Sequence, residues 1–340
     1  MRRAVVTARR KRVDSSSAVT RLAHPLAIAK YLDQIGAQSE RLLLRAGLPA
    51  LCRDPNEFVP VRNAWAAFDL AARSEDRDIA WHIGQFVHEN QLNTQLLQRI
   101  EGAPTLYQGL KNFVRLISSE ASNLALGIVE QDNDIILYSH YPGFENWPGY
   151  HSSQGYQFPI YLSVIRHYLG PDWSPDEIGI EAKKVPGVAK SIFRGTLIQS
   201  EAPFGFIKIP RNLLATAAPR RSTVTDSQIV LTKNFGFVEK LRAVLTPYIG
   251  EGYPPALFAA RLVGRSKRTL FRQLAERGTT YCALVDEIRF EKAKRLLHET
   301  TKDIGEIAQL VGIYDASHFT RMFRRVSGST PSTYRDSSGR

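Results

Sequence analysis

Cysteine is scarce in this chain of 340 residues, which contains only two. Cys52 and Cys282 lie far apart and outside any C-x-x-C pair, so the sequence indicates neither a disulfide framework nor a structural zinc site. His82 and His88 are spaced so that they do not share one face of a helix, and a shared metal is not expected either. We therefore predict no metal and no cofactor.

Long apolar runs and catalytic motifs are also missing. No stretch approaches the roughly 18 apolar residues typical of a membrane-spanning helix. The patterns G-x-S-x-G, G-x-G-x-x-G, H-E-x-x-H and the P-loop, which mark common catalytic and nucleotide sites, do not occur. The first residues lack the apolar core of a secretory signal. These absences predict a cytoplasmic protein that is not an enzyme.

Basic residues, by contrast, are abundant and unevenly placed, and the chain carries a net charge of +12. Residues 1–21 contain seven basic and one acidic residue, and residues 253–340 contain sixteen basic and nine acidic residues. The segment 22–252 is close to neutral, with 22 basic and 23 acidic residues. A neutral middle and a basic end predict a sensor joined to a nucleic-acid binder. We interpret residues 1–21 as a disordered basic arm rather than a transit peptide.

Residues 253–340 contain one short helical pattern twice. The segments Ala260–Gly264 and Ala308–Gly312 are offset by 48 residues (260 to 308), and a second apolar stripe follows each of them. A glycine ends each first helix, because the sharp turn needs a positive φ. Two copies in register predict two helix-turn-helix units rather than two ordinary helical hairpins. The side chains expected to point outward from the second helices are Lys267, Arg268, Arg272, Ser317, His318, Arg321 and Arg324.

This end of the chain resembles the AraC/XylS family of bacterial transcription regulators. The connecting segment Val285–Leu297 and the closing segment Gly328–Arg335 carry the resemblance together with the two repeats. It implies an all-α domain of two helix-turn-helix units joined by one long helix. It also implies a sequence-specific regulator in the nucleoid that binds double-stranded promoter or operator DNA, with RNA polymerase as a partner. The base-reading positions carry over to Arg268, Phe271, Arg272, Ser317, His318 and Arg321.

Phe271 departs from the polar residue that the family often has at its position. Two roles stay open for this ring: it touches a thymine methyl group, or it extends the core of the first unit.

Before the repeat, residues 22–215 mix two periodicities and predict an α+β domain. Apolar stripes predict helices, and two alternating runs around Asp132 and Asn133 predict a β-hairpin. The expected helices are 25–35, 40–46 (capped by Ser39), 61–73, 78–86, 104–117 and 158–169, and the expected strands are 123–130, 134–140, 178–182 and 204–209.

Residues 216–252 are predicted to connect the two domains. Ala217–Thr223 has no apolar periodicity and is typical of a linker. Asp226–Ile249 predicts one long amphipathic helix, which either packs against the DNA-binding domain at 253–340 or pairs with a second copy in a homodimer.

The domain at 22–215 resembles, through segments such as Asp54–Pro60 and Leu169–Pro175, the arabinose-regulator-type effector domain of one AraC subgroup. The resemblance implies a small organic effector. Some relatives carry repair activity at a zinc-held cysteine, but this domain has only Cys52. The alternative is a protein-interaction module without a small-molecule ligand. The candidate effector residues are Tyr141, Trp147, Tyr156 and Arg166, and their aromatic members either line a pocket or pack a loop.

Overall fold

A computed structural model describes residues 18–89, 100, 102–219 and 236–337. The described chain forms two compact units. The N-terminal unit contains 18–20, 24–46, 61–89, 100 and 102–219, and the C-terminal unit contains 21–23, 47–60 and 236–337. Of the predicted disordered basic arm at 1–21, residues 1–17 lie outside the described residues, whereas Val19–Arg21 form a short strand in which Val19 is buried. Segment 47–60, which the sequence assigns to the effector domain, therefore belongs to the C-terminal unit.

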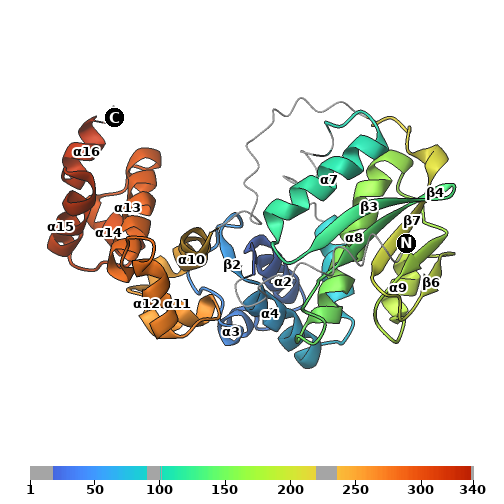
Figure 1. Cartoon of the computed structure of the whole chain (residues 1–340), viewed down its shortest axis with the longest axis horizontal. Coiled ribbons are helices and arrows are strands. Elements are labelled where there is room, and N and C mark those ends of the chain that lie inside the picture. The colour runs from blue at the N-terminus through green and yellow to red at the C-terminus, as the bar shows by residue number, and fades with distance from the viewer. Residues whose placement is uncertain (1–17, 90–99, 101, 220–235, 338–340) are drawn as a thin grey trace. The chain divides into compact units, whose positions relative to one another are not determined.

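Helices and a mixed sheet make up the N-terminal unit (Figure 1). The sheet has the order β3-β4-β7-β5-β6, antiparallel except for the parallel pair β5 and β6. The predicted hairpin is confirmed, with Asp132 at φ 50° in its turn. The strands are β3 (Ala125–Gln131), β4 (Asp134–His140), β5 (Glu177–Gly179), β6 (Leu197–Gln199) and β7 (Gly205–Pro210).

Seven α-helices of this unit lie in the described part of the chain. They are α2 (Ala23–Gln34), α3 (Ser39–Arg45), α4 (Val61–Ser74), α5 (Ile79–Glu89), α7 (Leu106–Glu120) and α8 (Tyr150–Leu169), with the short α9 (Gly187–Ile192) in addition. α8 lies at the centre and packs on α4, α5 and α7. Two short strands, β1 (Val19–Arg21) and β2 (Phe58–Pro60), include or adjoin the positions at which the chain leaves one unit and enters the other.

Three local predictions about these elements are wrong. Ser39 does not cap α3, since Gln38 is the N-cap and the Ser39 hydroxyl donates to the Asp33 carboxylate. α8 begins eight residues earlier than the predicted helix at 158, because its first turns are buried among other elements and show no apolar stripe. Ala217 and Ala218 are not free linker: both are paired with the backbone at 104–105.

The C-terminal unit is all-helical apart from β2. It contains α10 (Phe237–Leu245), the 3-10 helix η4 (Thr246–Glu251), α11 (Ala256–Leu262), α12 (Lys267–Ala275), α13 (Tyr281–Glu299), α14 (Ile304–Leu310), α15 (Ala316–Ser327) and α16 (Pro331–Ser337). The single helix expected over 226–249 is wrong in extent. Gly236 is extended at ψ 179°, so α10 begins after it, and the helix changes to 3-10 at Thr246, just before Pro247. Residues 220–235 lie outside the described part.

Segment 47–60 is fastened to the C-terminal unit by polar contacts. The Tyr248 hydroxyl donates to the Gly47 carbonyl at 2.7 Å, and the Glu251 carboxylate accepts from the amide of Ala50 at 2.5 Å. Glu57 pairs with Arg295 at 3.7 Å, and burial raises the pKa of the Glu57 carboxyl. These contacts make the segment part of the unit that carries the tandem repeat.

Candidate nucleic-acid interface

Two helical hairpins flank α13 in the C-terminal unit, α11 with α12 and α14 with α15 (Figure 1). Each hairpin turns at the glycine that the sequence indicates, Gly264 at φ +62° and Gly312 at φ +70°. L-residues with a side chain rarely adopt this conformation. The predicted fold class, an α+β domain followed by an all-α domain of two helix-turn-helix units, is confirmed.

Side-chain caps fix where the second helix of each hairpin begins. Ser266 accepts from the amide of Thr269 at 3.1 Å, and Asp315 accepts from the amide of His318. Asp303 and Glu306 form a capping box at the start of α14. Each cap satisfies an amide that the first helical turn would leave unpaired. The start of a helix also sets which residues face outward, so these caps orient α12 and α15.

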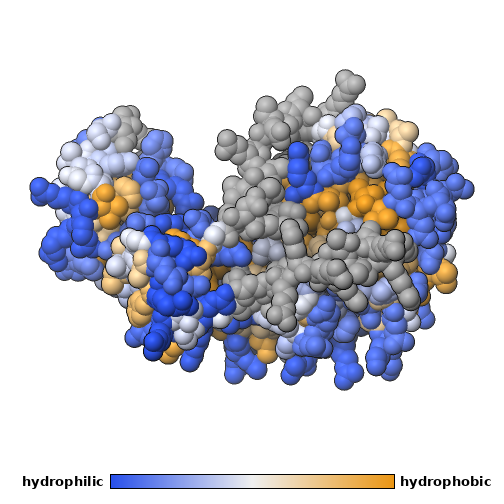
Figure 2. All heavy atoms as spheres, viewed as in Figure 1, coloured by the Kyte–Doolittle hydropathy of each residue, from blue (hydrophilic) through white to orange (hydrophobic). Residues whose placement is uncertain are grey.

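All eight side chains predicted to bind DNA are exposed. They project from α12 and α15, while the apolar stripes of those helices are buried, with Leu270 and Phe319 inaccessible to solvent. Figure 2 shows hydrophilic side chains gathered over α12 and along α15. The arrangement leaves one polar face on each second helix, and contact of these residues with DNA stays a prediction.

The arginines on these faces are free or weakly held. Arg272 pairs with Glu276 at 3.1 Å, and both side chains are at least half exposed. Such exposed pairs contribute about 1 kcal/mol or less, so separating Arg272 from Glu276 costs little free energy. The side chains of Arg321 and Arg324 make no hydrogen bond or ion pair within the described part of the chain.

Phe271 is placed in a way that agrees with both roles that the sequence leaves open. Its ring is 42% exposed and lies edge-on to the Tyr281 ring, with 6.4 Å between centroids. The ammonium of Lys267 stands 5.7 Å from its centroid. Part of the ring therefore extends the packing of the first hairpin, and the rest remains free to meet a thymine methyl group.

Sequence reasoning assigned no role to Arg289, which supports the second turn. Its side chain is 3% exposed, and its Nη2 donates to the Gly312 carbonyl at 2.9 Å. Its guanidinium lies 5.5 Å from the centre of the Tyr253 ring, and burial lowers its pKa. Arg289 thus ties α13 to the turn between α14 and α15. Its place in the middle of an otherwise amphipathic helix is the only sequence signal for it.

The four predicted effector residues do not form one site in the N-terminal unit. Tyr141 and Trp147 both pack edge-on against Trp65, at 4.9 and 6.4 Å between centroids. Tyr156 is buried against Phe68. Arg166 lies ten residues after Tyr156 on α8, about 15 Å along the helix axis. The three aromatic residues therefore pack a loop and part of the core, and Arg166 lines a pocket.

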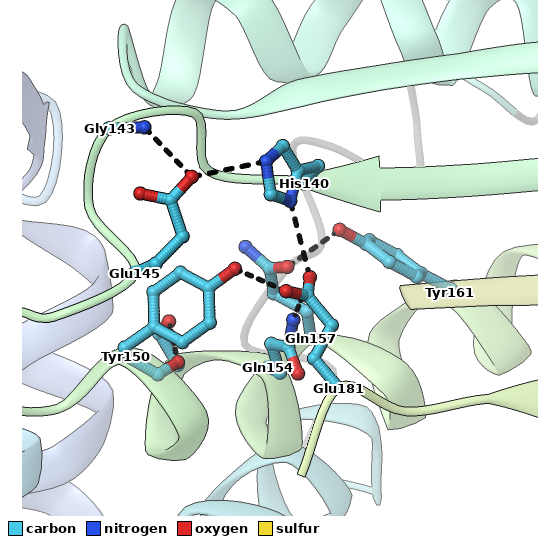
Figure 3. A network of polar contacts seen from close by, with 9 residues as sticks. His140, Gly143, Glu145, Tyr150, Gln154, Gln157, Tyr161 and Glu181 are labelled. Carbon is cyan, nitrogen blue, oxygen red and sulfur yellow. Dashed lines mark hydrogen bonds and ion pairs between the residues drawn. The ribbon is translucent and has the colours of Figure 1, made fainter. Parts of the chain in front are cut away.

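A buried polar network holds that loop against α8 (Figure 3). Glu181 accepts from the Tyr150 hydroxyl and from the Gln154 amide, each at 2.5 Å. His140 lies between Glu181 and Glu145, 3.4 Å from each carboxylate. Burial raises the pKa of the Tyr150 phenol, and the neighbouring Glu181 carboxylate raises it further to a smaller extent. The phenol therefore stays neutral and donates its proton to the hydrogen bond. The network is a packed polar layer in which the buried Nε2 of His140 makes no hydrogen bond and has the Glu145 carboxylate 3.4 Å away.

Two negative observations hold for the described residues. Within 18–89, 102–219 and 236–337, no group of three or more His, Cys, Asp or Glu side chains is placed to hold a metal ion. No helix in the same part of the chain is long and apolar enough to cross a membrane.

The fold and the exposed basic faces define a tandem helix-turn-helix protein, and two family models match the chain accordingly. Residues 36–217 match the N-terminal arabinose-binding domain of AraC transcription regulators, and residues 259–337 match a helix-turn-helix domain. The first match covers more than half of the chain. The chain belongs to the AraC family of transcription regulators.

Curated relatives include two regulators from Pseudomonas aeruginosa. The ornithine utilization regulator is 32% identical over 151 residues, which cover 42% of this chain and 44% of that protein. The regulator VqsM is 32% identical over 189 residues, covering 51% and 57%. The chain thus matches about half the length of these relatives. The solved regulator CdpR from the same species aligns with 91% of this chain at 19% identity and a TM-score of 0.38.

Proposed function

We propose that this protein is a sequence-specific DNA-binding transcription regulator whose N-terminal unit holds a small organic effector. The observation that carries the proposal is the pair of capped second helices, α12 and α15, which expose Arg272 and Arg321 from buried apolar stripes. A helix of this kind fits the major groove of B-DNA. Two such helices joined by α13 suit two successive groove segments on one face of the duplex.

Affinity and sequence preference come from different side chains in this proposal. Lys267, Arg324 and their basic neighbours neutralise phosphates and set affinity without reading sequence. Arg268, Arg272, Ser317, His318 and Arg321 meet base edges, with Phe271 beside them. An arginine donates two hydrogen bonds to guanine O6 and N7, which is the commonest specific contact.

The division of labour follows the proposed domains. Residues 1–21 are a basic arm, 22–215 bind the effector, 216–252 link the domains and support a homodimer, and 253–340 bind DNA. An effector acts by binding one arrangement of the domains more tightly than another. RNA polymerase is the expected protein partner on promoter DNA, in the cytoplasm and on the nucleoid.

An enzymatic role is not proposed. One relative, 37% identical over 62 residues that cover 18% of this chain, is named a bifunctional transcriptional activator and DNA repair enzyme. A repair site built on zinc-held cysteines needs several of them, and the two cysteines of this chain are Cys52 and Cys282. A protein-interaction module in place of the effector domain is the alternative, and it predicts that no small molecule stabilises the N-terminal unit.

Salt dependence tests the DNA-binding proposal. Because binding releases counterions, the logarithm of the affinity for duplex DNA should fall linearly with the logarithm of the salt concentration, with a slope of roughly −0.9 per phosphate contacted. Fluorescence anisotropy of the full chain on labelled duplex measures this slope. A flat response would contradict the proposal.

A further inference from the structure

Arg166 and Arg194 line one pocket of the N-terminal unit, with a volume of about 400 Å³. This volume lies within the roughly 300–1,000 Å³ of small-molecule sites. Pro159 and Leu162 of α8 and Ile192 of α9 give the pocket an apolar wall. Its other lining residues are polar or at a loop: Gln85, Pro171, Asp172, Ser174 and Ser191. An apolar wall with a few convergent polar groups is the usual composition of a ligand site.

The guanidinium of Arg166 is held in place on one side only. Its Nε donates to the Trp173 carbonyl at 2.8 Å, and its Nη2 to the Ser174 hydroxyl at 3.4 Å. Its Nη1 makes no hydrogen bond to any part of the chain that the structure describes. Burial lowers the pKa of Arg166, and Asp172 acts in the opposite direction. The charged guanidinium is therefore partly desolvated, and an anionic partner would stabilise its charge.

Arg194 stands at the rim of the same pocket without a partner in the described chain. The preceding residue, Phe193, is 1% exposed and stacks edge-on with Trp81 and Phe158. This anchor fixes the backbone of Arg194 while its side chain stays exposed. Two guanidinium groups and the single carboxylate of Asp172 leave one positive charge in the lining, which matches a monoanion better than a polyanion.

We propose that this pocket binds a small organic monocarboxylate. Arg166 and Arg194 hold the carboxylate through charge-assisted hydrogen bonds, and the apolar body of the ligand packs against Leu162 and Ile192. The inference deepens the proposed effector control and rests on it for its regulatory consequence. It differs from the sequence-based prediction because Tyr141, Trp147 and Tyr156 have no part in the site.

Calorimetric titration of the full chain tests the proposal with butyrate, hexanoate, benzoate and phenylacetate, each compared with its primary amide. At least one carboxylate should bind, and its amide should bind at least about tenfold more weakly, because the amide lacks the charge. Arg194→Gln should lower the affinity for that carboxylate by roughly ten- to a hundredfold. Arg115→Gln removes an exposed arginine of α7 that lies outside the pocket and whose side chain has no partner among the described residues, so it should leave the affinity for the carboxylate unchanged.

Arg194→Gln is the decisive variant, because Arg194 makes no contact that the fold needs. Arg166→Lys keeps the positive charge of Arg166 but removes the planar guanidinium that can donate two hydrogen bonds at once, so it should also weaken binding of the carboxylate. The proposal is overturned if no carboxylate binds better than its amide, if both variants bind as the parent does, or if inorganic phosphate competes as well as the carboxylate. DNA affinity without carboxylate, measured by mobility shift, tests the regulator separately, so the two proposals can fail independently.

Discussion

Gly312→Ala should lower the free energy of unfolding of the C-terminal unit by more than about 2 kcal/mol. Gly312 has φ +70°, and a Cβ there would lie 2.2 Å from the carbonyl oxygen of Ile249 and 2.8 Å from the amide nitrogen of Gly252. Both atoms belong to backbone, so the turn between α14 and α15 has to open. Because Arg289 also holds this turn, α15 should lose its orientation, and DNA binding should fall with stability.

Gly328→Ala is the matched control. Gly328 ends α15 at φ +80°, and no atom of the described residues lies within 4 Å of where its Cβ would be. The control therefore introduces the same backbone strain without the collision, and about 1 kcal/mol is expected. Thermal and denaturant unfolding of the full-length variants give the comparison. Equal losses at the two glycines would contradict the role of the contact with Ile249 and Gly252.

Replacing Arg272 and Arg321 by alanine should remove most of the sequence preference of the protein. Each single change should cost roughly 1–3 kcal/mol on a preferred site and relax the preference at one base position. The two residues lie on different hairpins, so the double variant should show nearly additive losses. For Arg272 the net loss includes the release of Glu276, which contributes little because that pair is exposed.

Arg261→Ala is the control for charge alone. Arg261 is exposed on α11, the first helix of its hairpin, and the change removes one positive charge without touching either second helix. It should weaken binding to preferred and to random DNA by the same factor. Quantitative mobility shifts on both kinds of duplex separate the cases. If the Arg272→Ala and Arg321→Ala variants lose the same factor of affinity on both duplexes, these arginines contact only phosphate.

The C-terminal unit was the more predictable part, because its signals are local. Gly264, Gly312, the capping box at Asp303 and the apolar stripes each act within a few residues, and the helices begin and end close to where these signals stand. Arg289 escaped prediction because its partner, the Gly312 carbonyl, is 23 residues away. Phe235-Gly-Phe237 breaks the apolar pattern, and α10 begins at that break after the extended Gly236, whereas the single helix predicted over 226–249 ran through it.

The N-terminal unit was harder, because its helices are buried from several sides. α4 and the β-hairpin were predicted from stripes and alternation, but the first half of α8 shows neither. Two of the aromatic residues proposed for a pocket lining, Tyr141 and Trp147, pack against Trp65, which is distant in sequence. Arg166 was singled out from its place on α8, whereas its companions Gln85 and Arg194 come from other segments that only the tertiary fold brings together.

A protection footprint on DNA fragments that the full chain retains from a genomic library tests the central claim most directly. If α12 and α15 enter successive major-groove segments, the protein should protect two segments on one face of the duplex, about one helical turn or roughly 34 Å apart. In the Arg272→Ala variant one segment should lose its base contacts, and in Arg321→Ala the other. Uniform protection without two segments, or no retained sequence in common, would contradict the claim that these two helices read DNA.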